Sequence, residues 1–363
     1  MRLSTLIILV PLILSVGPAF AEQEAGPVEH GIVYFKEGRF AGWPANNGIW
    51  SWGNEIVVGF SLGYFEYTPD GHPIDRDRPS SMRQARSYDG GETWEIETPS
   101  FVKPDGTERA SSELKEKINF THPNFAMRFR NNRFYYSYDR CNTWEGPFLL
   151  PDFGRKGLLA RTDYIVNGKH DLMAFIATEK DIGGEGWPCC IRTRDGGLTW
   201  EFVGWIGQQP GPDGYSIMPS SLRISNHTLL SIIRRRSVID GEKEWWIEGH
   251  LSPNNGRDWY RLAEPHIDNR SNPPHMIRLQ DGRFALTYGY RREPFGIRAV
   301  LSDDEGKTWG EEIILRDDGG VWDLGYPRTV QRPDGKIVTI YYFNKGEREE
   351  RYIAYTIWDP GRR

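Results

Sequence analysis

Short apolar runs of strand type recur along the whole chain, and each begins at or directly after a turn-forming dipeptide. Examples are EIVVGF, HTLLSII, RFALTY and KIVTIYY, which belong to the dipeptides Gly53-Asn54, Asn226-His227, Asp281-Gly282 and Asp334-Gly335. A turn dipeptide beside an apolar run is typical of a β-hairpin. Stretches with helical periodicity are scarce. The pattern therefore predicts an all-β chain that is built from hairpins.

A polar turn motif, called the box below, interrupts these runs five times. It reads SYDGGETW, TRDGGLTW and SDDEGKTW in its clearest copies, and SYDRCNTW and SPNNGRDW in two degenerate ones. Its third residue is acidic or an amide, and successive copies are spaced 50, 56, 59 and 50 residues apart, at Asp89, Asp139, Asp195, Asn254 and Asp304. This spacing fits one four-stranded propeller blade per repeat.

The residue types of the box suit a turn better than a catalytic role. The aspartate side chain can accept N–H groups of its own turn, and the glycine permits the positive φ that such a turn requires. The tryptophan can bury its ring between neighbouring sheets while its indole N–H finds an acceptor. We therefore interpret the box aspartates as structural.

The repeat count predicts a six-bladed β-propeller. After the fifth box, one more hairpin unit from Gly320 to Trp358 completes a sixth blade without a box, and the strand GIVYFKE (Gly31–Glu37) could close the ring by pairing with it. The second repeat is irregular, because Asn131-Asn132 precedes Asp139 by only seven residues. Its strands are therefore expected to be compressed or differently paired.

The first residues have the features of an export signal. Arg2 precedes a short apolar segment, and Ala19-Phe20-Ala21 forms a cleavage site before Glu22. The apolar segment is too short and too interrupted to span a bilayer. We predict a signal peptide over residues 1–21 and a single propeller domain over residues 22–363. The mature protein is then expected to be secreted or periplasmic, without membrane insertion.

Composition narrows the partners and cofactors. The net charge of −5 argues against a nucleic-acid partner. Three cysteines are too few for a disulfide framework, although a bridge from Cys141 to Cys189 or Cys190 stays open. The sequence has no CxxC or HExxH motif and no histidine cluster, so we expect no metal and no cofactor. The oligomeric state is left open.

The boxes, together with the count of six blades, resemble the sialidase (neuraminidase) superfamily of BNR or Asp-box repeat proteins, over nearly the whole chain after residue 21. Box-bearing propellers include glycosidases, lyases and non-catalytic binders, so the box indicates the fold more than the activity. The resemblance implies an active site on the propeller axis. Three arginines would bind a substrate carboxylate, a tyrosine assisted by a glutamate would be the nucleophile, and an aspartate would be the acid/base.

Matching this pattern position by position assigns several candidates. The stretch DLGYPRTVQRPDGKIVTIYY resembles the tyrosine-bearing strand and places Tyr326 at the nucleophile. Arg235 and Arg291 each lie nine residues after a hairpin turn, just past a second strand, where the superfamily has substrate-binding arginines. Arg298 lies in the strand before a box and resembles the third arginine. A shift of one residue stays open for the first two, because arginines stand beside them at Arg234, Arg236 and Arg292.

Three positions depart from the superfamily pattern. Gly42 stands where the first arginine is expected, and Tyr342 stands where the glutamate partner of that arginine is expected. The glutamate that would assist Tyr326 falls near Ser220 or Ser221, so Tyr326 has no evident base. We therefore expect a site that differs from the standard sialidase site.

Polar residues that open the inner strands provide candidates that do not depend on the resemblance. Because inner strands surround the axis, such residues are expected to converge on one funnel. We assign Asp163 and His275 to acid/base chemistry, and three others to substrate binding, namely His122, Asp323 and Arg328.

The loop HPIDRDRP follows the second strand of the first blade, where the superfamily keeps its acid/base aspartate. It contains Asp75 and Asp77, of which we favour Asp75. The alternative is a solvated charge cluster, because arginines alternate with these aspartates. Asp163 is the competing candidate for the acid.

Three functional hypotheses follow. The first is an exo-acting glycoside hydrolase that removes terminal acidic sugars, with sialic acid first because of the resemblance, so that its partner would be an acidic glycan or sialoglycoconjugate. The second is a His/Tyr-based glycosidase or lyase that acts on uronic-acid glycans, which would explain the missing arginine and glutamates. The third is a non-catalytic propeller that only binds glycans.

Overall fold

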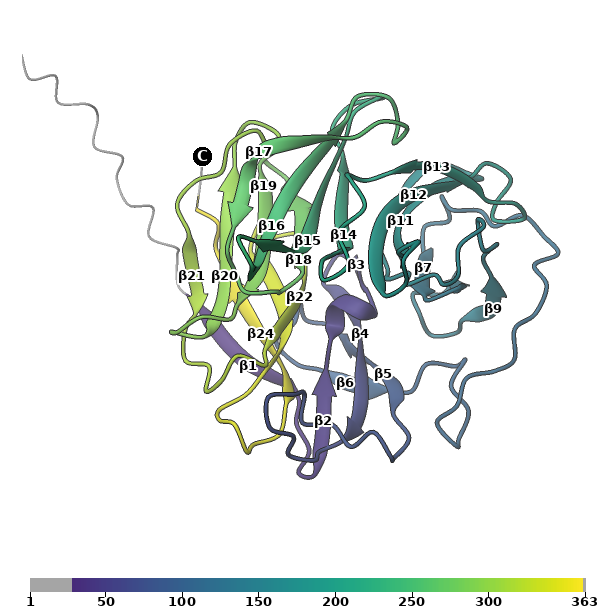
Figure 1. The fold of residues 1–363 in the computed structure, drawn as a ribbon. Coiled ribbons are helices and arrows are strands. Elements are labelled where there is room, and N and C mark those ends of the chain that lie inside the picture. Colours follow the sequence, from purple (N-terminus) through teal and green to yellow (C-terminus); the bar gives the residue numbers. More distant parts are fainter. Residues whose placement is uncertain (1–27, 362–363) are drawn as a thin grey trace, which may run out of the picture.

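The computed structural model describes residues 28–361, which form six β-sheets arranged as blades around a central axis (Figure 1). The predicted signal peptide, residues 1–21, lies outside the described residues. Within the described chain the only helical element is one turn of 3-10 helix, η1 (Pro44–Asn46), and no helix there could cross a membrane. The prediction of an all-β, six-bladed β-propeller is confirmed.

The first three blades follow the chain from β2 to β13. Blade one contains β2 (Arg39–Gly42), β3 (Ile49–Trp52), β4 (Glu55–Tyr64), β5 (Ser81–Ser87) and β6 (Glu95–Glu97). Blade two contains β7 (Ala126–Arg130), β8 (Arg133–Ser137) and β9 (Glu145–Leu149). Blade three contains β10 (Tyr164–Gly168), β11 (Asp171–Glu179), β12 (Glu185–Thr193) and β13 (Glu201–Trp205).

The remaining blades continue the same antiparallel order. Blade four contains β14 (Tyr215–Arg223), β15 (Leu229–Ile239), β16 (Glu242–Ser252) and β17 (Tyr260–Ile267). Blade five contains β18 (Pro274–Arg278), β19 (Phe284–Tyr290), β20 (Gly296–Ser302) and β21 (Ile313–Arg316). Blade six contains β22 (Gly325–Gln331), β23 (Ile337–Phe343), β24 (Tyr352–Trp358) and β1 (Glu29–Tyr34).

The ring is closed by a strand from the opposite end of the chain. Strand β1 pairs antiparallel with β24, with His30 opposite Thr356 and Ile32 opposite Ala354. Figure 1 shows the purple strand β1 beside the yellow strand β24. The predicted closing strand is therefore confirmed, although it begins and ends slightly earlier than Gly31–Glu37.

Blade two has three strands, whereas the other blades have four or more. Because the turn at Asn131 lies so close to the second box, only five residues remain for β8 (Arg133–Ser137). The predicted compression of this repeat is confirmed. Ser112 forms an isolated parallel bridge to Phe148 of β9, so an irregular segment lies along the outer strand.

The first box is held by hydrogen bonds within its own turn. The carboxylate of Asp89 accepts N–H groups of Glu92 and Thr93 at 3.0 and 2.9 Å and the Thr93 hydroxyl at 2.5 Å. Burial would raise the pKa of Asp89, but these hydrogen bonds lower it to about 2. The indole N–H of Trp94 donates to the carbonyl of Gly91 at 2.9 Å, and Gly91 has a φ of +96°. The carboxylate, the threonine and the indole N–H of this box therefore form hydrogen bonds within its own turn.

Apolar side chains fill the space between adjacent blades. One buried cluster joins Ile56 and Val58 of blade one to Val338 and Ile353 of blade six. The three cysteines are buried and free, and they belong to three different clusters, with Cys141 in blade two and the other two on β12. The disulfide that the sequence left open is therefore not formed in this structure.

Candidate functional site

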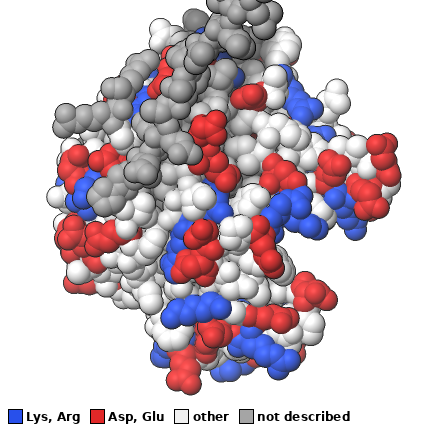
Figure 2. All heavy atoms as spheres, turned by 90° about the vertical axis from the view of Figure 1, so that its left-hand side faces the viewer, with Lys and Arg blue, Asp and Glu red and all other residues white. Residues whose placement is uncertain are grey.

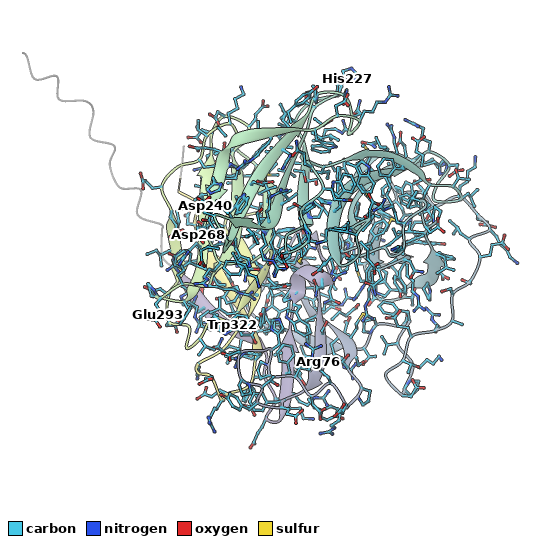
Figure 3. The ribbon with its side chains drawn as sticks, in the orientation of Figure 1. Arg76, His227, Asp240, Asp268, Glu293 and Trp322 are labelled. Atoms are coloured by element: carbon cyan, nitrogen blue, oxygen red, sulfur yellow. The ribbon has the colours of Figure 1, made fainter. Side chains whose placement is uncertain are left out.

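A cavity of about 850 Å³ opens between blades four, five and six and the loop that joins β4 to β5. Arginines, aromatic rings and a histidine contribute most of its wall, which is lined by Asp70, His72, Tyr215, Arg234, Arg236, Trp245, Arg270, Ser271, Arg291, Arg292, Glu293, Phe295, Trp322 and Tyr326. Figure 3 labels Glu293 and Trp322, which lie on the left of that view. The cavity therefore collects residues from four separate parts of the chain.

The charge of this cavity has the opposite sign to that of the whole protein. Five arginines line it, against two carboxylates, whereas the chain has a net charge of −5. On the face that Figure 2 presents, basic and acidic side chains are interspersed instead of segregated. A concave surface with one dominant sign of charge concentrates ions of the opposite sign. The cavity therefore favours an anionic ligand.

Tyr326 is held in an unusual backbone conformation at the centre of this group. Its φ is +52°, a region that bulky residues rarely adopt. The pairing of β22 with β23 shifts register between Gly325 and Arg328, and the Tyr326 N–H donates to the side chain of Asn272 at 2.9 Å. Such strain persists only where the surroundings impose it, and it is common at functional sites. The local bulge thus turns the Tyr326 ring toward the cavity.

Arg234 is buried and binds the hydroxyl of Tyr326. Its Nη1 donates to the Tyr326 oxygen at 2.9 Å, and Nη2 donates to the Tyr215 hydroxyl at 3.0 Å. Nη2 and Nε also donate to the hydroxyl of Ser271 at 2.6 and 3.2 Å, while Nη1 lies 3.7 Å from the sulfur of Met218. All five N–H groups of the guanidinium therefore have an acceptor.

These contacts decide the charge state of Arg234. Burial alone lowers the pKa of a guanidinium, but the hydroxyls of Tyr326 and Tyr215 raise the pKa of Arg234. The side chain is thus a fixed cation beside the Tyr326 oxygen. A fixed cation stabilises negative charge that develops on that oxygen.

Arg291 is the second buried arginine of the cavity. It donates to the carbonyl oxygens of Leu324 and Ser271 at 3.0 to 3.2 Å and to the Tyr342 hydroxyl at 2.9 Å. Its guanidinium lies 5.2 Å from the ring centre of Trp322 and 5.5 Å from that of Tyr326. Within the described chain its hydrogen bonds all end on neutral oxygens, while its charge also helps to lower the pKa of Asp323, which shares the Tyr342 hydroxyl with it.

His72 and Asp323 form a hydrogen-bonded pair at the edge of the cavity. The Nδ1 atom of His72 lies 2.6 Å from Asp323 Oδ1, the Tyr342 hydroxyl donates to the same oxygen at 2.6 Å, and Arg351 Nε donates to Oδ2 at 3.0 Å. Burial raises the pKa of Asp323, but His72 and Arg351 outweigh it and hold that pKa below its ordinary value. Asp323 is therefore a buried carboxylate with a complete set of donors.

Two of the arginines that the sequence assigned to substrate binding lie outside the cavity. Arg235 donates to Ser216 at 2.9 Å and lies 3.6 Å from Glu248, because neighbouring residues of a strand point to opposite faces of the sheet. The buried arginine on β15 that lines the cavity is Arg234. Arg298 lies on β20, where it forms an ion pair with Glu312 at 3.2 Å inside blade five. Only Arg291 of the three assigned arginines lines the cavity.

Asp163, His275 and Arg328 form a separate group, in which Arg328 is buried while Asp163 and His275 are partly exposed. The Thr329 N–H donates to His275 Nδ1 at 3.0 Å, the Ser221 N–H donates to Asp163 at 3.3 Å, and none of the three lines the cavity. Burial raises the pKa of Asp163 to about 7, and it lowers the pKa of His275 well below its ordinary value. Burial also lowers the pKa of Arg328 to about 10. This group therefore packs within the propeller without reaching the cavity.

Asp75 and His122 are engaged in their own loops. Asp75 accepts the N–H groups of Asp77 and Arg78 at 2.9 and 3.1 Å, so it forms a turn. The ring of His122 lies 4.6 Å from that of Tyr138, and neither His122 nor Asp75 lines the cavity. In the loop that contains Asp75, the residues that line the cavity are Asp70 and His72.

Sequence reasoning missed His72 and Trp322, and it kept Arg234 only as the one-residue alternative to Arg235. His72 stands three residues before Asp75, in the loop where an acid/base residue was expected. Side chains alternate between the two faces of a strand, but nothing in the sequence showed which residues of β15 face the cavity. Strand alternation alone therefore could not identify Arg234. For metals, the described residues contain no group of three or more His, Cys, Asp or Glu side chains that could hold an ion.

The comparisons with known proteins agree on the fold. Residues 119–339 match the model of the BNR repeat-like domain. A Dyadobacter fermentans protein of unknown function has a similar structure, with 21% identity and a TM-score of 0.67, over 92% of this chain and 99% of that one. A search of curated proteins found no significant match.

Two enzymes of known structure share the fold at lower identity. One is a Penicillium chrysogenum alpha-L-arabinanase complexed with arabinobiose, with 14% identity and a TM-score of 0.56 over 87% of this chain and 96% of that one. The other is a Trypanosoma rangeli sialidase mutant that displays trans-sialidase activity, with 12% identity and a TM-score of 0.54, over 92% of this chain and 59% of that one. Such identities indicate the fold alone. Because the family model spans more than half of the sequence, the chain belongs to the BNR repeat-like family.

Proposed function

We propose that this protein is an exo-acting glycoside hydrolase that removes terminal acidic sugars from glycans. The observation that carries the proposal is the cavity itself, in which five arginines and several aromatic rings surround Tyr326. Guanidinium groups recognise carboxylates, and concave sites with apolar rings and a few polar groups suit small ligands. A sialic acid is the first candidate, because the family shares its fold with sialidases.

The charge of the cavity favours an acidic sugar over a neutral one. The arabinanase with the same fold was crystallised with arabinobiose, a neutral disaccharide. A neutral ligand would leave the excess of five arginines over two carboxylates in the cavity lining without a compensating anion. An acidic sugar would complement Arg291, whose hydrogen bonds end on neutral oxygens.

The proposed nucleophile is Tyr326, and its activation differs from the superfamily pattern. A phenol is a weak nucleophile until a neighbouring group stabilises its ionised form. Here Arg234 donates to the Tyr326 oxygen at 2.9 Å, and the position of the expected glutamate is occupied by serine. We therefore assign to Arg234 the stabilisation of charge on Tyr326, and to Arg291 the binding of the substrate's acidic group.

A second candidate reaction is β-elimination from a uronic-acid glycan. The contact between Tyr326 and an arginine, together with a histidine in the same cavity, supports it. An elimination needs a base and a proton donor beside a carboxylate-binding group, and it needs no second catalytic carboxylate. The product would carry a new carbon–carbon double bond, which absorbs ultraviolet light.

The test uses the purified protein on a fluorogenic sialoside, a panel of uronic-acid glycans and a neutral arabinan. Release of a terminal acidic sugar that is lost in Tyr326→Phe would support the hydrolase. An ultraviolet-absorbing product would support the elimination instead. Binding of acidic glycans without any product would identify a glycan-binding propeller, and activity on arabinan alone would contradict the assignment of an acidic substrate.

A further inference from the structure

We infer that His72 transfers the proton in the reaction at this cavity, and that Asp323 positions it. The inference rests on the proposed function and deepens it, because it names a catalytic residue that the sequence pattern did not indicate. The superfamily's pattern assigns this role to an aspartate, whereas here a histidine–aspartate pair reaches the cavity.

Asp323 is enclosed by hydrogen-bonding partners. Its side chain is 1% exposed, and its two oxygens accept from Tyr342 and Arg351 as well as contacting His72. An ionised carboxylate only accepts hydrogen bonds, so it requires Nδ1 of His72 to carry a hydrogen. The other ring nitrogen, Nε2, is then the atom that exchanges a proton. A carboxylate that orients a histidine in this way stabilises the protonated ring when it forms.

His72 lies in the wall of the cavity, where a ligand can reach its ring. Its side chain is 26% exposed and lines the same cavity as Tyr326. The ring centre lies 5.2 Å from that of Trp43, which meets it edge-on, and 5.7 Å from that of Trp322. The imidazole is therefore fixed in orientation by two tryptophans and by Asp323, yet it remains accessible to a ligand.

The competing carboxylates of the cavity lack this support. Asp70 and Glu293 are both exposed, and Asp70 lies in the same loop as His72 with a φ of +56°. Catalytic groups act best when neighbouring residues hold their geometry. His72 has three such neighbours in Asp323, Trp43 and Trp322. The geometry therefore favours His72 as the proton-transfer group.

The reaction can be written so that protons and electron pairs balance. The phenol of Tyr326 first gives its proton to water, and Arg234 stabilises the charged oxygen that remains. The protonated ring of His72 then gives its Nε2 proton to the glycosidic oxygen, which keeps the electron pair of the breaking carbon–oxygen bond, while the ionised oxygen of Tyr326 bonds to the sugar carbon. Neutral His72 then takes a proton from water, whose oxygen displaces Tyr326. One water is consumed, and both residues return to their starting states.

The leaving group provides the test. A substrate with a sugar or alkyl leaving group needs the proton from His72, whereas an activated aryl leaving group departs without it. We expect His72→Gln to lower kcat by about 10²- to 10⁴-fold on an acidic disaccharide and by less than about tenfold on the matching aryl glycoside. Asp323→Asn should show the same dependence on the leaving group with a smaller loss. His227→Gln, an exposed histidine at the top of Figure 3, is the matched control.

The outcomes separate the two proposals. If the native protein turns over no acidic glycan or aryl glycoside, the proposed function is wrong and this inference falls with it. If the native protein is active and His72→Gln retains its activity, or loses it equally on both substrates, the assignment of His72 alone is overturned. Thermal unfolding of each variant shows whether it is folded. A folded His72→Gln variant whose loss of kcat depends on the leaving group as expected supports the inference.

Discussion

Two buried or partly buried aspartates of this protein have depressed pKa values for different structural reasons. Asp89 of the first box accepts hydrogen bonds only from residues within four positions along the chain. Asp323 is bound by His72, Tyr342 and Arg351, which lie 251, 19 and 28 residues away. The comparison teaches that the turns of the propeller are locally determined, whereas the candidate site exists only when the ring is closed.

Asp323→Asn is expected to cause the largest loss of stability among the variants that test this comparison. The substitution leaves Arg351, whose side chain is 3% exposed, without its charged partner. Removing one member of a buried ion pair costs several kcal/mol, and we expect about 2–4 kcal/mol less stability to chemical denaturation. Asp304→Asn in the fifth box is the matched control. An equal loss of stability in both variants would contradict the distinction between local and long-range aspartates.

A second prediction concerns Arg234 and its neighbour on β15. Lysine keeps the charge but cannot supply five donors in a planar arrangement, so Arg234→Lys should lower kcat by about 10- to 100-fold on whichever acidic substrate is turned over. Arg235→Lys lies on the other face of the sheet and should stay within about twofold of the native rate, in line with strand alternation. Steady-state kinetics on both variants measures this. A larger effect from Arg235 would contradict the assignment of the buried guanidinium to Arg234.

A third prediction is a pH dependence of stability from the group that contains Asp163, His275 and Arg328. Burial depresses the pKa of His275 in the folded protein, whereas in the unfolded chain this histidine takes up a proton near its ordinary pKa of 6.5. The unfolded state therefore binds more protons below that pH, and native stability falls as the pH drops from 6.5 toward the folded pKa. His275→Gln should lack this part of the acid sensitivity.

The measurement for His275 is thermal unfolding of native and variant protein from pH 8 to pH 5. We expect the difference in Tm between native protein and His275→Gln to be largest at pH 8 and to shrink below pH 6.5. Asp163 acts in the opposite direction, because its raised pKa makes the folded state bind the extra proton below about 7. A difference that stays constant with pH would show that His275 does not titrate on unfolding.

The smallest effect on stability is expected from a substitution of the aspartate in a box turn. Asp304 accepts the Thr308 N–H at 2.9 Å and the Thr308 hydroxyl at 2.7 Å. Asp304→Ala removes these bonds from an exposed turn and should cost about 1–2 kcal/mol in urea unfolding without changing kcat. Asp304→Asn should cost less, because Asn254 serves the same position in blade four. A change in kcat that exceeds the loss of stability would give the box a role beyond folding.

Most of the fold could be predicted from the sequence because its signals are short in range. The boxes, the turn dipeptides and the odd spacing before Asp139 each specify a local conformation, and together they predicted the blade count, the closing strand and the compressed second blade. The predicted signal peptide stays a prediction, since residues 1–21 lie outside the described chain. The length of β8 followed directly from the position of its turn.

The candidate site could be predicted only in outline. Tyr326, Arg291 and Asp323 were named as site residues, and the structure brings all three to one region. Arg235 was assigned and Arg234 was kept as the one-residue alternative, because β15 alternates regularly from Leu229 to Ile239 but the sequence does not show which of its two faces meets the cavity. His72 was overlooked in favour of Asp75, since only the packing of Trp43 and Trp322 shows which residue of that loop turns inward.

The sequence by itself determined the repeat, the all-β class and the turns, because each depends on hydrogen bonds between residues a few positions apart. The tertiary structure alone decided which arginines face the cavity, which residue contacts the Tyr326 hydroxyl and which residue pairs with Asp323. These contacts join residues as far apart as His72 and Asp323, and they form only after six blades have packed and the ring has closed through β1 and β24. Their energy therefore depends on the completed ring, which no local pattern encodes.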